Sequence, residues 1–226
     1  MPFLTRNPSY YLPALQEETT DPLHIGLSLG ENAAQNNDGD DQSDSTISAE
    51  ESWSELATAI QQTSRSIRCL WIRIKNQAYD NGNDAAQLAA LCVFGEGLIG
   101  ATAPESLVLE GQGVEMDQLT GLREYLARNT TLRGIKLLRT NLDAPSSLML
   151  NNFLVGNSSL RVLDLTANPR LDDGFVGAVL GAILQNGGCR LETLNIFEEF
   201  EGDLDANIGV TESGVDSIAS FVSQSE

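Results

Sequence analysis

A repeated pattern of leucine and isoleucine residues constrains the fold of this chain more than any other feature. The pattern LxxLxL, in which x is any residue, is clearest at 160–165 and recurs at 132–137 and, with isoleucine last, at 191–196. Weaker copies begin at Ile67 and Pro104. The copies at 104, 132 and 160 follow one another at intervals of 28 residues. Apolar residues with a period of two indicate a short buried β-strand in each copy.

A second motif, with helical spacing, precedes the strand motifs at fixed distances. Two leucines four residues apart are followed, three residues later, by an asparagine, and this triplet occurs twice (Leu122, Leu126 and Asn129; Leu150, Leu154 and Asn157). Each unit is therefore predicted to contain a strand, a turn and a helix. A unit of this size cannot bury its apolar face alone and must stack on its neighbours.

These motifs resemble the ribonuclease-inhibitor-like leucine-rich repeats, whose motif LxxLxLxxN is complete at residues 160–168. The resemblance implies an α/β fold, a leucine-rich-repeat solenoid of about five repeats. In such a short curved horseshoe, a parallel sheet lines the concave side and helices line the convex side. We assign residues 46–226 to this domain, with 46–66 as an N-terminal capping helix. We expect Asn168 to bond backbone groups that the bend after its strand leaves unpaired.

Residues 1–45 are predicted to form a disordered acidic tail. Eight carboxylates face one cation, Arg6, and no large apolar residue occurs from Gly30 to Thr46. Such a segment buries too little surface to offset its ordering entropy. Residues 2–29 are more apolar, so a short linear motif or a strand docked on the body is the alternative there. A second hypothesis is that the acidic residues of 17–44 fold back onto basic residues of the body.

Charge and composition argue against several classes of function. The chain carries 13 Lys and Arg against 32 Asp and Glu, a net charge of −19, so we expect no nucleic acid and no membrane as a partner. Its single histidine, His24, argues against His-based catalytic and zinc sites. We expect no metal, no cofactor and no enzymatic activity. The few unpaired cysteines indicate a cytoplasmic protein, with the nucleus as the alternative.

The sequence Gly95-Glu-Gly97-Leu-Ile-Gly100 matches the letters GxGxxG of a dinucleotide-binding turn. A phosphate-binding turn must follow a strand and open a helix. The repeat pattern places no such strand-to-helix turn at 95–100. We therefore interpret these glycines as unrelated to a cofactor.

The residues between the apolar strand positions are expected to face solvent on the concave sheet. They include six of the 13 cations of an otherwise acidic chain. A basic centre of Arg133, Lys136, Arg139 and Arg161 would bind an acidic segment of a protein partner. Aromatic residues at the ends would act as apolar anchors. The predicted contact residues are Trp71, Arg73, Arg133, Lys136, Arg139, Arg161, Asp164, Asn195 and Phe197.

The bland alternative is that these positions are simply polar and solvated, and the assignment of faces is sensitive to a slip of one residue. We favour a protein–protein interaction module without chemistry of its own. The alternative, from fold analogy alone, is a regulator of a small Ran-like GTPase. Residues 211–225 look like the helix of a further repeat, whose strand would begin at 228. Either this helix caps a monomer, or an open C-terminal end gives weak self-association.

Overall fold

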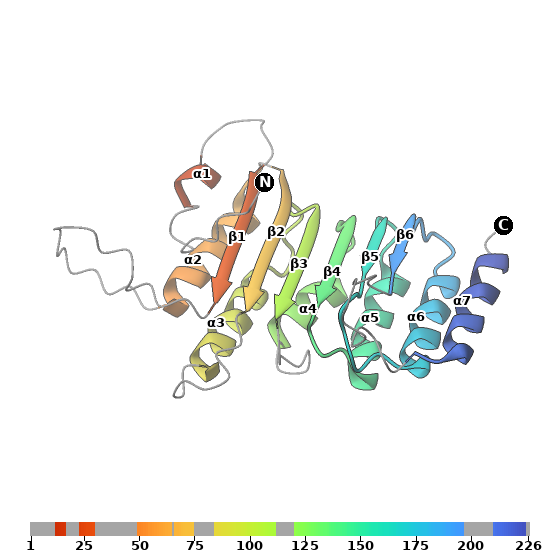
Figure 1. Cartoon of the computed structure of the whole chain (residues 1–226). Coiled ribbons are helices and arrows are strands. Elements are labelled where there is room, and N and C mark those ends of the chain that lie inside the picture. The colour runs from red at the N-terminus through yellow and green to blue at the C-terminus, as the bar shows by residue number, and fades with distance from the viewer. Residues whose placement is uncertain are drawn as a thin grey trace.

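Six parallel strands form one sheet in the computed structural model, which describes residues 12–16, 23–29, 49–64, 66–74, 84–111, 120–196 and 210–224. The strands lie side by side in the order in which they occur along the chain (Figure 1). They are β1 (Leu23–Leu29), β2 (Ile67–Ile74), β3 (Ser106–Gly111), β4 (Gly134–Leu138), β5 (Val162–Asp164) and β6 (Thr193–Asn195).

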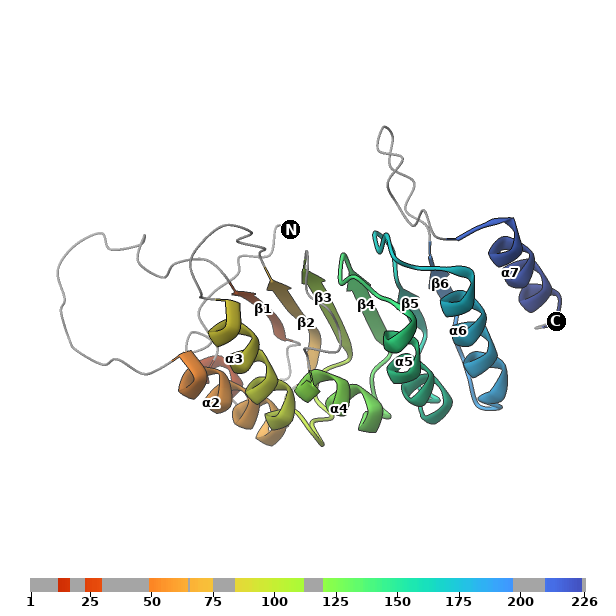
Figure 2. The same ribbon diagram turned by 90° about the horizontal axis from the view of Figure 1, so that it is seen from below.

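A helix connects each strand to the next, and the helices cover one face of the sheet (Figure 2). The short α1 (Leu12–Gln16) precedes β1, and α7 (Glu212–Gln224) follows β6. The connecting helices are α2 (Ala49–Gln62), α3 (Asp84–Gly97), α4 (Thr120–Arg128), α5 (Ala144–Gly156) and α6 (Asp173–Gln185). Successive helices from α2 to α7 pack against one another. The predicted α/β architecture with a parallel sheet is confirmed, and the succession of units is compatible with a solenoid-like arrangement.

The apolar residues of the strand motif form the core between the sheet and the helices. In β2 the side chains of Leu70, Ile72 and Ile74 are buried, while the residues between them are half-buried on the opposite face. The leucines of the complete motif at 160–165 are all buried. Trp53 of α2 meets Phe94 of α3 edge to face, with ring centres 5.1 Å apart. The period of two thus sets the face of each strand, as predicted.

Strand β1 corrects the prediction of a disordered tail for residues 23–29. It pairs with β2 over its whole length, and the side chains of Ile25 and Leu27 are fully buried. The docked strand, our alternative, is what the structure shows here. The segment alternates apolar residues with His24, Gly26 and Ser28 and carries no acid, so it can bury one face. Apart from α1, the rest of 1–45 lies outside the described residues.

Because β1 precedes it, α2 is not the N-terminal cap that we predicted. It connects β1 to β2 and packs on both α1 and α3. Its apolar stripe of Trp53, Leu56 and Ile60 is buried, as the helical spacing predicted. The sheet therefore has one strand more than the five expected.

Asparagines at the ends of three helices tie each unit to the one before it. The Nδ2 of Asn129 donates to the carbonyl of Ala101 at 3.3 Å, and that of Asn157 donates to the carbonyl of Asn129 at 3.2 Å. The Nδ2 of Asn186 continues the series to the carbonyl of Asn157 at 2.7 Å. The Oδ1 of each side chain accepts backbone N–H groups of its own turn. The helix-to-strand turns of successive units are thus hydrogen-bonded to one another.

Asn168 holds the turn at the other end of the strands. Its Oδ1 accepts the backbone N–H of Thr140 at 2.8 Å, and its Nδ2 donates to the carbonyls of Leu137 and Leu165 at 2.7 and 2.8 Å. The side chain is fully buried. The structural role predicted for Asn168 is confirmed.

Glycines allow α3 and α4 to approach each other so closely that their backbones are in contact. A Cβ atom on Gly121 would overlap the carbonyl oxygen of Cys92 and lie 2.9 Å from the backbone nitrogen of Glu96. A Cβ atom on Gly95 would overlap the backbone of α4 in the same way. Gly95 and Gly97 lie in the last turns of a helix, so the letters GxGxxG belong to helix packing in this structure.

Candidate functional site

The face of the sheet opposite the helices, which we call the open face, presents rows of side chains set by the strand register. The central row crosses the sheet through the register neighbours Gly26, Trp71, Val108, Lys136, Asp164 and Asn195. A second row contains Ser28, Arg73, Glu110 and Leu138. Neighbouring strands of a sheet lie about 4.8 Å apart, so each side chain can contact the next in its row.

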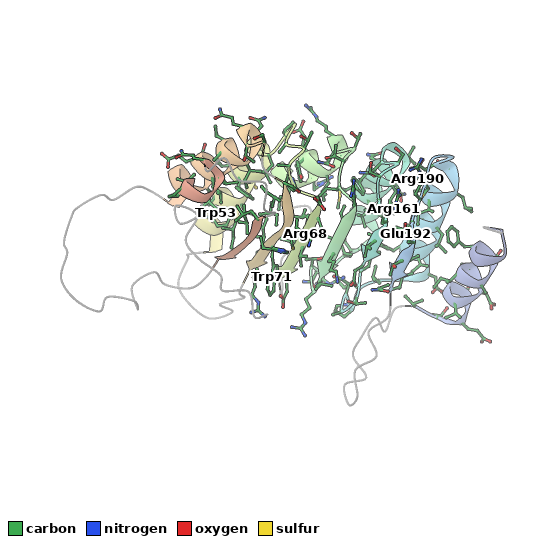
Figure 3. All side chains as sticks on the ribbon, turned by 90° about the horizontal axis from the view of Figure 1, so that it is seen from above. Trp53, Arg68, Trp71, Arg161, Arg190 and Glu192 are labelled. Atoms are coloured by element: carbon green, nitrogen blue, oxygen red, sulfur yellow. The ribbon has the colours of Figure 1, made fainter. Side chains whose placement is uncertain are left out.

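Five of the nine predicted contact residues lie in these two rows (Trp71, Arg73, Lys136, Asp164 and Asn195). In Figure 3, Trp71 lies on the side of the sheet away from the helices, whereas Trp53 lies among them. Arg139 directly follows β4 in a left-handed conformation, with φ 57°. Phe197 lies outside the described residues.

One ion-pair cluster joins three strands of the open face. Oε1 of Glu110 on β3 accepts a hydrogen bond from Nη2 of Arg73 at 3.2 Å. The same oxygen lies 3.7 Å from Nη1 of Arg139. The guanidinium of Arg73 also stands 5.7 Å from the centre of the Trp71 ring. Glu110 is largely enclosed, with 15 % of its side chain exposed, while both arginines reach solvent. The cluster fixes Arg73 against an aromatic face.

A second cluster surrounds Asp164. Its Oδ2 lies 3.5 Å from Nζ of Lys136 and accepts a hydrogen bond from Nδ2 of Asn195 at 3.3 Å. Its Oδ1 accepts the hydroxyl of Thr166 at 2.9 Å. Because Asp164 is buried and bonds three neighbours, it holds Lys136 and Asn195 in place. We interpret it as a positioning residue of the face.

The structure does not bring the predicted basic centre together. Lys136 and Arg139 lie on or beside the open face and are paired with carboxylates of neighbouring strands. Arg133 and Arg161 instead lie directly before β4 and β5, at the edge where the strands begin. The period of two does not extend to these positions, because the strands begin one residue later, at Gly134 and Val162. The open face is therefore mixed in charge rather than basic.

An apolar patch combines the predicted Trp71 with two residues outside the predicted set, Val108 and Leu138. Val108 is the register neighbour of Trp71 on one side and of Lys136 on the other. Leu138 is the register neighbour of Glu110. All three apolar side chains, Trp71, Val108 and Leu138, are half-buried. Comparing the solvent-facing residues of adjacent strands position by position, rather than strand by strand, would have grouped them.

Cys69 lies near this patch, at the register position of His24 on β1. Burial raises the pKa of its thiol, while the hydroxyl of Ser106 and the charge of Lys136 act in the opposite direction. A raised pKa leaves less of the reactive thiolate at pH 8.

We expect Cys69 to react with iodoacetamide at pH 8 more slowly than free cysteine does, because burial disfavours its thiolate. Lys136→Gln removes a charge that favours the thiolate and should slow the reaction further. Peptide mapping by mass spectrometry follows the Cys69 peptide over time in the native protein. The same peptide, alkylated after denaturation, is the control. A native rate equal to that of free cysteine would contradict this prediction.

Neither the protein-family models nor the curated proteins compared with this chain gave a match. Among the residues described, no helix has the length and apolarity to cross a membrane. In the same part of the chain, no three His, Cys, Asp or Glu residues are grouped as ligands of a metal ion.

Proposed function

We propose that this chain is a leucine-rich-repeat module that binds a protein partner on its open sheet face and performs no chemistry of its own. The observation that carries the proposal is the group formed by Trp71, Arg73, Val108 and Leu138. In it an arginine stands over the half-buried Trp71, Val108 is the register neighbour of Trp71 on β3, and Leu138 lies on the following strand, β4. Tryptophan and arginine dominate the binding energy of protein interfaces.

The leucine-rich-repeat assignment is supported by the repeat of contacts as well as of letters. Asn168 bonds Thr140, which occupies the same motif position 28 residues earlier. Arg139 and Ala167, also equivalent positions, share a left-handed backbone, with φ 57° and 58°. Asn129 and Asn157 make equivalent bonds 28 residues apart. Repeated sequence positions thus have repeated conformations.

The paired charges of the open face favour binding because they are already in place. Arg73, Lys136 and Arg139 are held by Glu110 and Asp164, so less side-chain entropy is lost when a partner binds. Their exposed donors remain able to bond a partner. A fitting partner surface would set an apolar side chain on Trp71 and Leu138, with polar groups around it.

We expect Trp71→Ala to weaken binding of the partner at least about tenfold, as loss of a central aromatic anchor does. The partner is first captured from a lysate with the full chain, and its affinity is then measured with purified protein. Leu148→Ala is the matched control, because Leu148 is an apolar side chain on a helix with 66 % of its surface exposed.

Circular dichroism must show that both variants fold. A partner lost by Trp71→Ala and kept by Leu148→Ala supports the open face. A partner that binds Trp71→Ala as tightly as the parent chain would contradict the proposal and direct attention to the helices.

A further inference from the structure

Arginines gather along the edge of the sheet at which the strands begin. Arg68, Arg133 and Arg161 share the second position of the strand motif, and Arg190 directly precedes the last copy. The backbone N–H of Arg161 donates to the carbonyl of Arg133 at 2.7 Å, and that of Arg133 donates to the carbonyl of Glu105 at 2.8 Å. Glu105 directly precedes β3, so one acid lies between Arg68 and Arg133 along this edge. Figure 3 views this edge and labels three of the four arginines. We call Arg68, Arg133, Arg161 and Arg190 the basic edge.

The cations of the basic edge differ from those of the open face in their partners. Among the residues that the structure describes, Arg68, Arg133 and Arg190 form no ion pair, and all three are exposed. Arg73, Lys136 and Arg139 of the open face are each paired with a carboxylate. The guanidinium groups of the basic edge are therefore still able to bind an anion.

Arg161 is the fixed member of the basic edge. Its Nη1 donates to the carbonyls of Leu160 and Arg190 at 3.4 and 3.3 Å, and its Nε lies 3.2 Å from Oε1 of Glu192. The side chain of Glu192 is 71 % exposed, so this ion pair is at the surface and is readily exchanged for another carboxylate. Arg161 can thus add a contact at the centre of the edge.

Arg133 and Arg161 directly precede the neighbouring strands β4 and β5, whose backbones are about 4.8 Å apart. Arg133 forms no ion pair with a carboxylate of the described residues, and Arg161 is paired with the exposed Glu192. A carboxylate of a partner placed between the two guanidinium groups could accept a charge-assisted hydrogen bond from each. In a chain with a net charge of −19, such a group of cations is a local exception.

We propose that the basic edge binds an acidic segment of a protein partner, a short run of Asp or Glu lying along the strand starts. An extended chain advances about 3.3 Å per residue, so carboxylates one or two residues apart match a step between strands. A few arginines suit a short acidic run better than a long polyanion, which the overall negative charge repels. This surface is separate from the open face and does not depend on it.

The test measures binding of a fluorescein-labelled decaglutamate peptide to the full chain by fluorescence anisotropy at low ionic strength. We expect saturable binding that weakens as salt is added. The double variant Arg133→Ser, Arg190→Ser should lose at least about tenfold in affinity, the effect of about 1.4 kcal/mol.

Matched control variants distinguish the effect of where the arginines lie from the effect of the change in the net charge of the protein. The double variant Arg123→Ser, Arg170→Ser removes the same two charges away from the basic edge and should keep the affinity within about twofold. Trp71→Ala should also leave peptide binding unchanged, so that failure of the proposed function and failure of this inference are distinguishable. Circular dichroism checks that each variant folds, and Arg133→Lys should bind with intermediate affinity because lysine lacks the guanidinium fork.

Three results would overturn the proposal. The first is the absence of peptide binding at low ionic strength. The second is an equal loss of affinity in the Arg123, Arg170 control, since net charge alone would then explain it. The third is tighter binding of a ten-nucleotide single-stranded DNA than of the peptide, which would assign the edge to nucleic acid.

Discussion

Replacing Gly121 with alanine is expected to destabilise the protein by about 3 kcal/mol, the upper range for overpacking a closely packed site. The new Cβ atom would overlap the carbonyl oxygen of Cys92 and lie 2.9 Å from the backbone nitrogen of Glu96. These are backbone atoms of α3, so no side-chain rotation can make room. The helices must separate, and contacts on both sides of α4 are lost. Urea unfolding followed by circular dichroism measures the effect.

The control is Gly177→Ala in α6. A Cβ atom at Gly177 would meet nothing within 4 Å, so the substitution adds helix propensity without overlap. It should stabilise the protein by up to about 1 kcal/mol. The two alanine variants are therefore expected to change the free energy of unfolding in opposite directions. Equal stabilisation by both would show that α3 and α4 are not in backbone contact.

Replacing Asn168 with alanine is expected to lower the free energy of unfolding by at least about 3 kcal/mol. The side chain bonds the N–H groups of Thr140 and Leu142 and the carbonyls of Leu137, Leu165 and Thr166. Each buried backbone group left without a partner costs about 1–3 kcal/mol. Because Asn168 is fully buried, water can replace few of these bonds. The midpoint and slope of urea unfolding give the loss.

Asn152→Ala is the matched control, since Asn152 is exposed on α5. We expect this variant to stay within about 0.5 kcal/mol of the parent chain, as surface substitutions usually do. If Asn168→Ala were equally mild, the turn after β5 would not depend on the buried amide.

The sequence predicted the strands, the helices and the role of Asn168 because each is encoded locally. The period of two at 160–165 decides which side chains are buried, and the asparagine follows at a fixed distance. The same periodicity was present in β1. A docked strand was only the alternative there because the tail was judged by the composition of all 45 residues, in which the acids outweigh one apolar strand.

The site was predicted less well than the fold because its geometry depends on the register between strands. Glu110 pairs with Arg73, 37 residues earlier, and with Arg139, which follows the next strand. Neither separation equals a repeat interval of 28 residues, so no motif connects these residues. The four cations of the predicted basic centre are divided between the open face and the strand starts for a similar reason, because whether Arg133 faces the open side depends on where β4 begins. A single strand, read alone, does not contain that information.

The sequence motifs also did not predict where glycines are needed for the packing of α3 against α4. Gly95 and Gly121 are needed because of the backbone that lies opposite them. Within its own helix each would be an unfavourable residue. Their value becomes apparent once α3 and α4 are placed side by side.

The series of asparagines at 129, 157 and 186 limits the insertions and deletions by which such a protein can change in length during evolution. Each amide needs a carbonyl acceptor in the preceding unit, and the partners of Asn129 and Asn157 lie 28 residues earlier. An insertion of a few residues within the turns would displace these acceptors and leave buried amides unbonded. Duplication or loss of a whole unit would instead supply an equivalent acceptor at each junction. Evolution of this chain should therefore be easiest in steps of complete units.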